Sequence, residues 1–419
     1  MLRESFGTYL RLSRYWELDY NQPLKMKPNT YEHRTKETRR RIAIGQYMAA
    51  VFLFWVALFL YMPTLPVYLE SRTGNLAMVG TVLSMFGLWQ VFARLPLGIL
   101  SDWWGRRKTF IIAGFLMAAL GAWLLGNAVE YPALLIGRSI TGLSSSVWVL
   151  LLVAFSSLFR PEDAVRATSL LLFVNSAGRV LATSSTGFLN NLGGYTLAFQ
   201  LSAGAAVLGA VLLLPAHESR LPVKRRTMRG IGRLITRRDV LVPSLLNMVS
   251  QYTTWATTFG FVPVLAQKLG ADDVALGFLM SLNIVVVMAG TLLVTTIVKR
   301  IGSRRLVIVS VMLITAGLLA ATLAKSMTLI YVAQICAGLA GGTGYPALMG
   351  MSIEKVDEAD RSTAMGLHQS LVAVGVFSGS WISGIIAEAI GIQPMFAITT
   401  VGFLAAVWFI MRWYPAAHK

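Results

Sequence analysis

Long apolar runs alternate with short polar connections along the whole chain. A run of about 20 mostly apolar residues is long enough to form a helix that crosses a membrane, and the sequence holds twelve such runs. The pattern therefore predicts an all-α integral membrane protein with twelve transmembrane helices. The predicted spans are 43–68, 77–99, 109–127, 132–158, 166–190 and 195–215, followed by 241–267, 273–298, 304–323, 328–351, 363–388 and 394–412.

Composition supports this class, because 55% of the 419 residues are hydrophobic and only 13% are charged. The net charge of +18 comes from basic residues between the apolar runs, so it indicates contact with the lipid bilayer rather than with nucleic acid. Four histidines and one cysteine are scattered along the chain and give no metal-ligand spacing. No nucleophile–base set is visible, so we expect no metal, no cofactor and no enzymatic activity.

Lys and Arg gather in alternate connections. Of the 37 basic residues, 31 lie in the two ends of the chain, in the central segment and in every second short connection. Because positive loops stay on the cytoplasmic side, we expect both termini to be cytoplasmic in a multi-pass protein of the cell's inner membrane. The expected organisation is an N-terminal tail (1–42), a six-helix bundle (43–215), a basic linker (216–240), a second bundle (241–412) and a C-terminus (413–419).

A basic turn that contains glycine occurs once in each half of the chain. The first copy is Gly98-x-x-Ser101-Asp102-x-x-Gly105-Arg106-Arg107-Lys108. The second copy is Gly302-Ser303-Arg304-Arg305, and Gly302 lies 197 positions after Gly105. The same offset of 197 relates Gly194 to Gly391. A constant offset indicates two similar halves of six helices, and membrane proteins with two similar halves are mostly transporters.

The first basic turn resembles the signature that transporters of the major facilitator superfamily (MFS) carry between spans two and three. Arg138-x-x-x-Gly142 resembles the motif of their fourth span. The chain is therefore identified as a member of this family, similar to its bacterial efflux members. The resemblance implies two pseudo-symmetric six-helix bundles around a central cavity, and alternating access by rocking of the two halves.

The resemblance also implies a gate at the cytoplasmic ends of the spans, where Asp102 meets span eleven near Ser362. The alternative is a topology signal combined with a tight turn. Lys299 occupies the equivalent of the Asp102 position in the second half, so we expect the gate to be asymmetric. The gate residues are Gly98, Asp102, Gly105, Arg106 and Arg107.

Three arginines, Arg94, Arg138 and Arg179, lie inside apolar spans. Charge at mid-membrane normally faces a cavity or a partner. The resemblance implies proton coupling or substrate contact for Arg138, whereas Arg179 either lines the cavity or is structural. Arg94 is interpreted as structural, by snorkelling or by pairing with Asp102. No other carboxylate lies well inside a span, so His368 is the titratable alternative for coupling, unless it only packs.

Amide and aromatic residues mark the helices expected to line the cavity. Asn247, Gln251 and Trp255 recur every four positions in span seven and therefore share one helix face. Gln334 and Tyr345 lie in span ten. These residues either bind substrate or form hydrogen bonds between helices, and the sequence favours neither interpretation.

The sequence thus predicts a secondary transporter that moves a small-molecule substrate by alternating access. Our first hypothesis is a monomer that exports an amphiphilic drug or metabolite in exchange for protons. Span five lacks the Gly-Pro pair of drug–proton antiporters, which weakens this hypothesis. The alternatives are an importer or uniporter of an organic anion, favoured by Arg138 and Arg179, and a membrane receptor that senses a ligand without transporting it.

Overall fold

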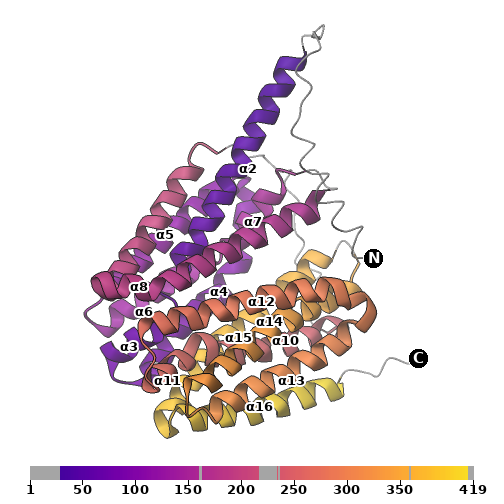
Figure 1. The fold of residues 1–419 in the computed structure, drawn as a ribbon. Helices are drawn as coiled ribbons and strands as arrows, with labels where there is room; N and C mark the ends of the chain where they lie inside the picture. Colours follow the sequence, from indigo (N-terminus) through magenta and orange to yellow (C-terminus); the bar gives the residue numbers. More distant parts are fainter. Residues whose placement is uncertain (1–28, 160–162, 217–233, 235, 358–359, 414–419) are drawn as a thin grey trace, which may run out of the picture. The chain divides into compact units, whose positions relative to one another are not determined.

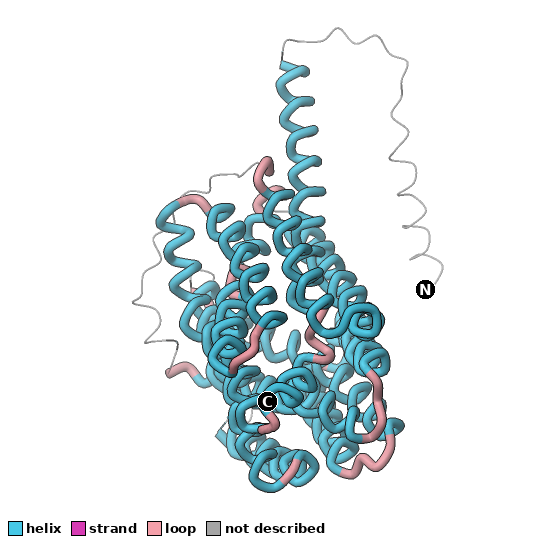
Figure 2. Tube along the Cα trace, turned by 90° about the vertical axis from the view of Figure 1, so that its left-hand side faces the viewer, coloured by secondary structure: helices cyan, strands magenta, loops and turns pink. Residues whose placement is uncertain are grey.

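The structure is a computed structural model that describes residues 29–159, 163–216, 234, 236–357 and 360–413. A few side chains within these ranges, including those of Asp102, Lys299 and Ser362, lie outside the description. The described part of the chain is helical and contains no β-strand (Figure 2). The predicted all-α class is therefore confirmed.

The helices before the basic linker account for six membrane spans. Two pairs of helices, α2 with α3 and α6 with α7, form the first and fourth spans, and α8 contains both the fifth and the sixth. Helix α2 begins well before residue 43, so the described part of the predicted tail is helical. The bounds are α2 (Asn29–Phe59), α3 (Leu65–Thr73), α4 (Leu76–Trp104), α5 (Arg107–Asn127), α6 (Tyr131–Ser145), α7 (Trp148–Ser156) and α8 (Ala164–Leu213).

Six further spans follow the linker, most of which (217–233 and 235) lies outside the described residues. The seventh span consists of α10 (Arg238–Ala256), a π-helical turn η3 (Thr257–Phe261) and α11 (Val262–Lys268). The others are α12 (Asp273–Ile301), α13 (Ser303–Thr322), α14 (Met327–Glu354), α15 (Arg361–Ile390) and α16 (Ile392–Trp413). Ten described helices are long and apolar enough to cross a membrane. Helix α8 is one of these ten but contains two spans, and the seventh span is not among the ten because η3 interrupts it. Together with the seventh span, the ten helices therefore correspond to the twelve predicted spans.

Glycines with positive φ form equivalent turns in the two halves. Gly105, between α4 and α5, has φ 67°, and Gly302, between α12 and α13, has φ 83°. Gly194 (φ 67°) bends α8 between the fifth and sixth spans, and Gly391 (φ 95°) separates α15 from α16. Only glycine adopts this backbone conformation without strain. The offset seen in the sequence therefore reflects a positive-φ glycine at two equivalent turns of each half, although Gly105 (ψ 12°) and Gly302 (ψ 148°) differ in ψ.

Within residues 43–419, which form one compact unit, each half packs its own helices together. Helix α5 packs on α6 and α8, and after the linker α14 packs on both α12 and α13 (Figure 1). The halves meet where α4 lies along α15 and where α8 lies along α12. We call the end that carries Gly74, Gly270 and Lys325 the distal end, and the opposite end, with Gly105 and Gly302, the proximal end.

Candidate functional site

The two halves are in backbone contact at the distal end of α4 and α15. Gly80 lies so close to Gly384 that a Cβ atom on Gly80 would be 2.7 Å from the Gly384 Cα atom. One turn further out, the backbone N–H of Leu76 donates to Glu388 Oε2 at 2.6 Å. Such contacts require small residues, because only they allow two helix backbones to approach this closely.

A second close contact joins α8 to α12. Gly187 lies directly against the backbone of Val274, and a Cβ atom on Gly277 would be 2.6 Å from the Thr183 carbonyl oxygen. The Asn190 amide donates to Asp273 Oδ2 at 2.8 Å. Together, the α4–α15 and α8–α12 glycine contacts form what we call the distal seal, the close backbone contacts between the halves at that end.

An aromatic cluster crosses between the halves on the proximal side of this seal. Phe86 stacks on Trp255 with ring centroids 5.3 Å apart, and Phe59 meets Phe259 edge-on at 6.2 Å. Both partners from the second half belong to the seventh span, whose π-helical turn η3 carries Phe259. The aromatic cluster consists of Trp55, Phe59, Phe86, Trp148, Trp255 and Phe259.

Two of the three membrane arginines lie on faces of this cluster. The guanidinium carbon of Arg138 is 4.3 Å from the Phe86 ring centroid, and that of Arg179 is 4.3 Å from the Phe59 centroid. Arg138 is 1% exposed. Neither arginine has a carboxylate partner among the described residues. A cation–π contact contributes about 0.5–2 kcal/mol, whereas an arginine at mid-membrane costs about 2.5–3.5 kcal/mol, so the single ring under Arg138 offsets only part of its cost.

Gly142 has a packing role beside Arg138. A Cβ atom on Gly142 would lie 2.8 Å from the Phe86 carbonyl oxygen, so this glycine lets α6 approach α4. Both residues of the Arg138-x-x-x-Gly142 motif therefore contact Phe86. Gly142 lies against its backbone, and Arg138 lies over its ring.

Arg94 bridges the halves on the proximal side of the cluster. Its Nη1 atom donates to Gln369 Oε1 of α15 at 3.1 Å, and its Nη2 atom donates to Gln90. Gln369 in turn donates to the Tyr345 hydroxyl of α14 at 3.0 Å. We call Arg94, Gln369 and Tyr345 the amide bridge. Sequence reasoning identified Arg94 as structural but missed Gln369, which no local pattern marks.

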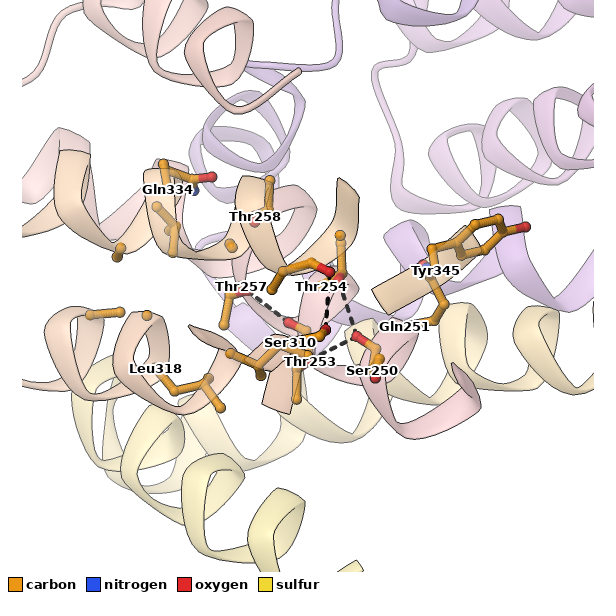
Figure 3. Close-up of a pocket in the computed structure, with 18 of the residues that line it drawn as sticks. Ser250, Gln251, Thr253, Thr254, Thr257, Thr258, Ser310, Leu318, Gln334 and Tyr345 are labelled. Atoms are coloured by element: carbon orange, nitrogen blue, oxygen red, sulfur yellow. Dashed lines mark hydrogen bonds between the residues drawn. The ribbon is translucent and has the colours of Figure 1, made fainter. Parts of the chain in front are cut away.

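The polar residues predicted in spans seven and ten line a cavity inside the second half, between α10, α13 and α14 (Figure 3). Its volume is about 40 Å³, which holds about three water molecules. Asn247, Gln251, Gln334 and Tyr345 contribute to its wall, while the Tyr345 ring extends away from the cavity (Figure 3). Trp255 faces the aromatic cluster instead. The sequence analysis placed these residues in spans seven and ten, which correspond to α10 and α14. It did not indicate that α13 forms the third wall of the cavity.

His368 is fully buried between α15 and α10. Ser244 donates to the Val240 carbonyl, so the Ser244 hydroxyl oxygen accepts the proton of His368 Nδ1 across 3.0 Å. Asn247 then donates to His368 Nε2 at 2.9 Å. Both ring nitrogens are occupied in this neutral tautomer, an arrangement typical of a packed histidine.

The predicted cytoplasmic gate is only partly described. Helix α4 ends after Trp104, and the N–H of Gly105 donates to the Ser101 carbonyl at 3.1 Å. Arg106 follows as the cap of α5. Gly98 and Arg107 lie in the last turns of α4 and the first of α5, respectively. The Asp102 and Ser362 side chains lie outside the described residues, so their pairing stays a prediction.

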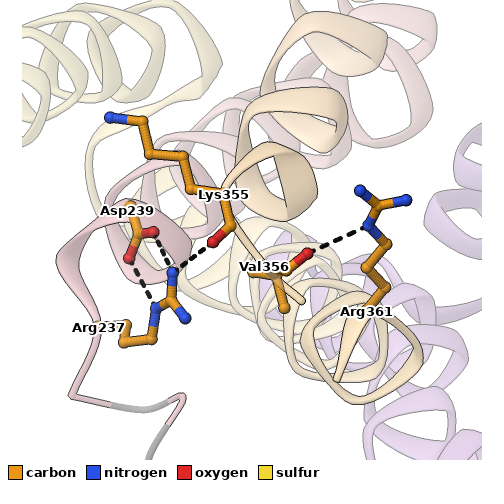
Figure 4. Close-up of polar contacts among 5 residues, drawn as sticks. All are labelled: Arg237, Asp239, Lys355, Val356 and Arg361. Atoms are coloured by element: carbon orange, nitrogen blue, oxygen red, sulfur yellow. Dashed lines mark hydrogen bonds and ion pairs between the residues drawn. The ribbon is translucent and has the colours of Figure 1, made fainter. Parts of the chain in front are cut away.

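A proximal clamp, which the sequence did not indicate, joins the start of α10 to the end of α14 (Figure 4). Arg237 donates to both carboxylate oxygens of Asp239, at 3.1 and 2.6 Å, and to the Lys355 carbonyl at 2.7 Å. These hydrogen bonds from Arg237 hold the pKa of Asp239 below its ordinary value of 3.8. The clamp therefore stabilises the folded state above that pH, and its contribution is lost as the pH falls through the lowered pKa.

Replacing Arg237 with methionine is expected to lower the unfolding free energy by about 0.2–1 kcal/mol, because the pair is partly exposed. The difference from the parent protein, measured by thermal unfolding in detergent, should shrink as the pH falls below 3.8. Arg361→Met is the matched control, since Arg361 donates to the Val356 carbonyl (Figure 4). A pH-independent difference for the Arg237 variant would contradict the prediction.

Twelve spans in two halves that meet at a sealed interface define a multi-pass membrane protein of the transporter type. The sequence profile of the Major Facilitator Superfamily matches residues 47–259 and 244–419. The chain belongs to this family.

Known relatives include transporters of several kinds. The chain is 25% identical over 387 residues to the multidrug resistance protein MdtH of Aeromonas hydrophila, covering 87% of this chain and 94% of the relative. It is 18% identical over 376 residues to the uncharacterized MFS-type transporter MJ1560 of Methanocaldococcus jannaschii, covering 85% and 96%. These relatives, like the family, are transporters and not enzymes.

Solved structures share the fold. The nucleoside transporter NupG has a TM-score of 0.71 at 17% identity, covering 90% of this chain and all (100%) of that one. A bacterial homologue of the human lysosomal transporter Spinster, in an inward-facing and unoccupied conformation, has a TM-score of 0.72 at 14% identity, covering 89% and 96%. The predicted fold of two six-helix bundles is confirmed.

Proposed function

We propose that this protein is an inner-membrane secondary transporter that exports an amphiphilic small molecule by alternating access. The observation that carries the proposal is the aromatic cluster, because its rings come from both halves of the chain. A molecule bound there contacts both halves, so its binding energy depends on how the halves are arranged, as alternating access requires.

The proposed orientation places both termini and the proximal end in the cytoplasm, following the distribution of Lys and Arg. The distal seal then closes the outward path, and the transported molecule reaches the aromatic cluster from the cytoplasm. Export is favoured over import by similarity to MdtH, which is named a multidrug resistance protein. We further propose that the transporter works as a monomer and in exchange for protons.

A second candidate function is import or uniport of an organic anion. It is favoured by Arg138 and Arg179, which lie on the cluster without a described carboxylate partner. The second candidate differs from the first in direction and in coupling, so a transport assay separates them.

The test is transport by the purified protein in liposomes, screened over lipophilic cations, organic anions and neutral metabolites with a pH-sensitive dye inside. Export coupled to protons predicts that adding the transported compound on the cytoplasmic side moves protons the opposite way. Arg138→Met should abolish this signal, and Arg412→Met, which removes a cation–π contact with Trp408 at the chain's end, should leave it unchanged. Substrate movement without any proton signal would contradict coupling, and movement of no compound would contradict transport.

A further inference from the structure

The first half of the chain contains buried hydrogen-bond donors that have no acceptor. The Nε atoms of Arg138 and Arg179 and the Trp55 Nε1 atom are all buried without a hydrogen-bond partner. Native proteins leave few buried polar groups unsatisfied, so each such group calls for a specific explanation. The groups named here are donors, whereas the buried unsatisfied Oδ1 atoms of Asn175 and Asn190 in the same half are acceptors.

These donors gather around the aromatic cluster. Arg179 lies over the rings of both Phe59 and Trp55, at 4.3 and 5.7 Å from their centroids. The Nη2 atom of Arg138 reaches only the Met62 sulfur, at 3.7 Å, and a thioether is a weak acceptor. The cluster thus combines two positive charges and an indole N–H with flat apolar faces, and it lacks a matching negative charge.

We propose that the aromatic cluster is an anion-binding site and that the transported molecule is an aromatic organic anion, such as an arylcarboxylate. Its carboxylate accepts hydrogen bonds from Arg138 or Arg179, because an arginine fork matches a carboxylate in geometry and charge. Its ring packs against the aromatic rings of the cluster, which requires that the stacked Phe86 and Trp255 rings separate. This inference rests on the proposed transport function and adds to it the sign of the substrate's charge.

The proposal also explains why two charges are kept where they are costly. An arginine at mid-membrane is tolerated when it faces a partner or a cavity, and the single ring under Arg138 offsets only part of its cost. A substrate anion supplies the missing hydrogen-bond acceptor each time it binds. When it leaves, the donors are again without an acceptor. A cationic amphiphile fits the same rings but is repelled by both guanidinium groups.

Binding to the purified full-length protein in detergent tests the proposal with three probes of similar shape. These are 2-naphthoate, its neutral carboxamide 2-naphthamide, and the cation 2-naphthyltrimethylammonium, each measured by quenching of tryptophan fluorescence. We expect naphthoate to bind at least about tenfold more tightly than the amide, and the cation to bind weakest. Each tenfold difference corresponds to about 1.4 kcal/mol.

Substitutions of the two arginines distinguish the contribution of their charge to probe binding from that of aromatic packing. Arg138→Met and Arg179→Met should each remove most of the preference for naphthoate over naphthamide, while binding of naphthamide persists and shows that the site is folded. Arg138→Lys should retain part of the preference, because it keeps the charge but not the fork. Arg412→Met is the matched control, since it removes an arginine that lies over Trp408 at 5.2 Å, away from the cluster.

Tighter binding of the cation, equal binding of naphthoate and naphthamide, or binding of none of the three probes would overturn the proposal. The proposal would also be overturned if Arg138→Met and Arg179→Met both kept the full preference for naphthoate over naphthamide. Counterflow of the same probes in liposomes distinguishes this failure from failure of the transport function. Naphthoate that binds but is not transported would refute transport, whereas transport of the cation alone would refute only the anion site.

Discussion

Replacing Gly187 with leucine is expected to favour the open distal end and to slow transport. Gly187 lies against the backbone of Val274 in the distal seal, where a side chain has no flexible neighbour to displace. Overpacking a tight contact costs about 1–3 kcal/mol, which shifts the ratio of closed to open molecules by about fivefold to somewhat more than a hundredfold. Alternating access requires both states, so the transport rate should fall by a similar factor.

Spin labels report this change directly. Val129 and Lys325 are exposed residues at the distal end of the two halves, and cysteines there, in a Cys336→Ser background, should move apart in the Gly187→Leu variant. Gly204→Leu is the matched control in the same helix, because nothing lies within 4 Å of its added Cβ atom. Both substitutions favour helix formation, so only the seal distinguishes them. Equal distances in both variants would contradict a role for the seal in closure.

Replacing Gln369 with leucine is expected to destabilise the protein more than replacing Arg94 with methionine. The first change removes the side-chain acceptor from the amide bridge and leaves the part-buried guanidinium only the Gln369 backbone carbonyl, at 3.5 Å, on its α15 side. Losing a partner of a buried charged donor costs about 1.5–3 kcal/mol or more. The second change removes the charge itself, together with its desolvation cost, so we expect a loss below about 1 kcal/mol.

The double variant Arg94→Met with Gln369→Leu should recover much of the stability that Gln369→Leu alone loses. Thermal unfolding of the three variants in detergent gives the interaction energy, which we expect to be about 1–2 kcal/mol. Tyr345→Phe serves as the control, because it removes only the acceptor of the neutral Gln369 hydrogen bond. Additive effects of the two single changes would show that Arg94 and Gln369 are not energetically coupled.

The span boundaries could be predicted because they depend on local composition. The sequence predicted a break between spans five and six near residues 191–194, and α8 bends at Gly193 and Gly194. The seventh span was predicted as one continuous helix, 241–267. The structure instead inserts the π-helical turn η3 at Thr257–Phe261. No apolar pattern signals it, because all five of its residues are buried and no exposed face marks the change of helical period.

The candidate site was predicted in part. The polar face of Asn247 and Gln251 does line a cavity, but Asn247 also holds His368 in place from another helix. The aromatic residues of the cluster were largely missed, since a phenylalanine in an apolar span resembles any lipid-facing or packed residue. The glycines of α4 carried a usable signal, because Gly80 and Gly87 are seven positions apart and therefore lie on one side of the helix. Gly87 lies against the backbone of Phe377 in α15.

The sequence by itself determined the class of protein, the number of spans, the twofold repeat and the four glycine turns. Each of these depends on the length of an apolar run or on the backbone conformation of one residue, and such properties are local. Only the tertiary structure decided what each buried arginine contacts. Arg94 finds an amide 275 positions away in the chain, and Arg138 and Arg179 find aromatic faces. Inside a membrane the lipid-facing and partner-facing sides of a helix are equally apolar, so hydrophobic periodicity does not indicate which helices meet.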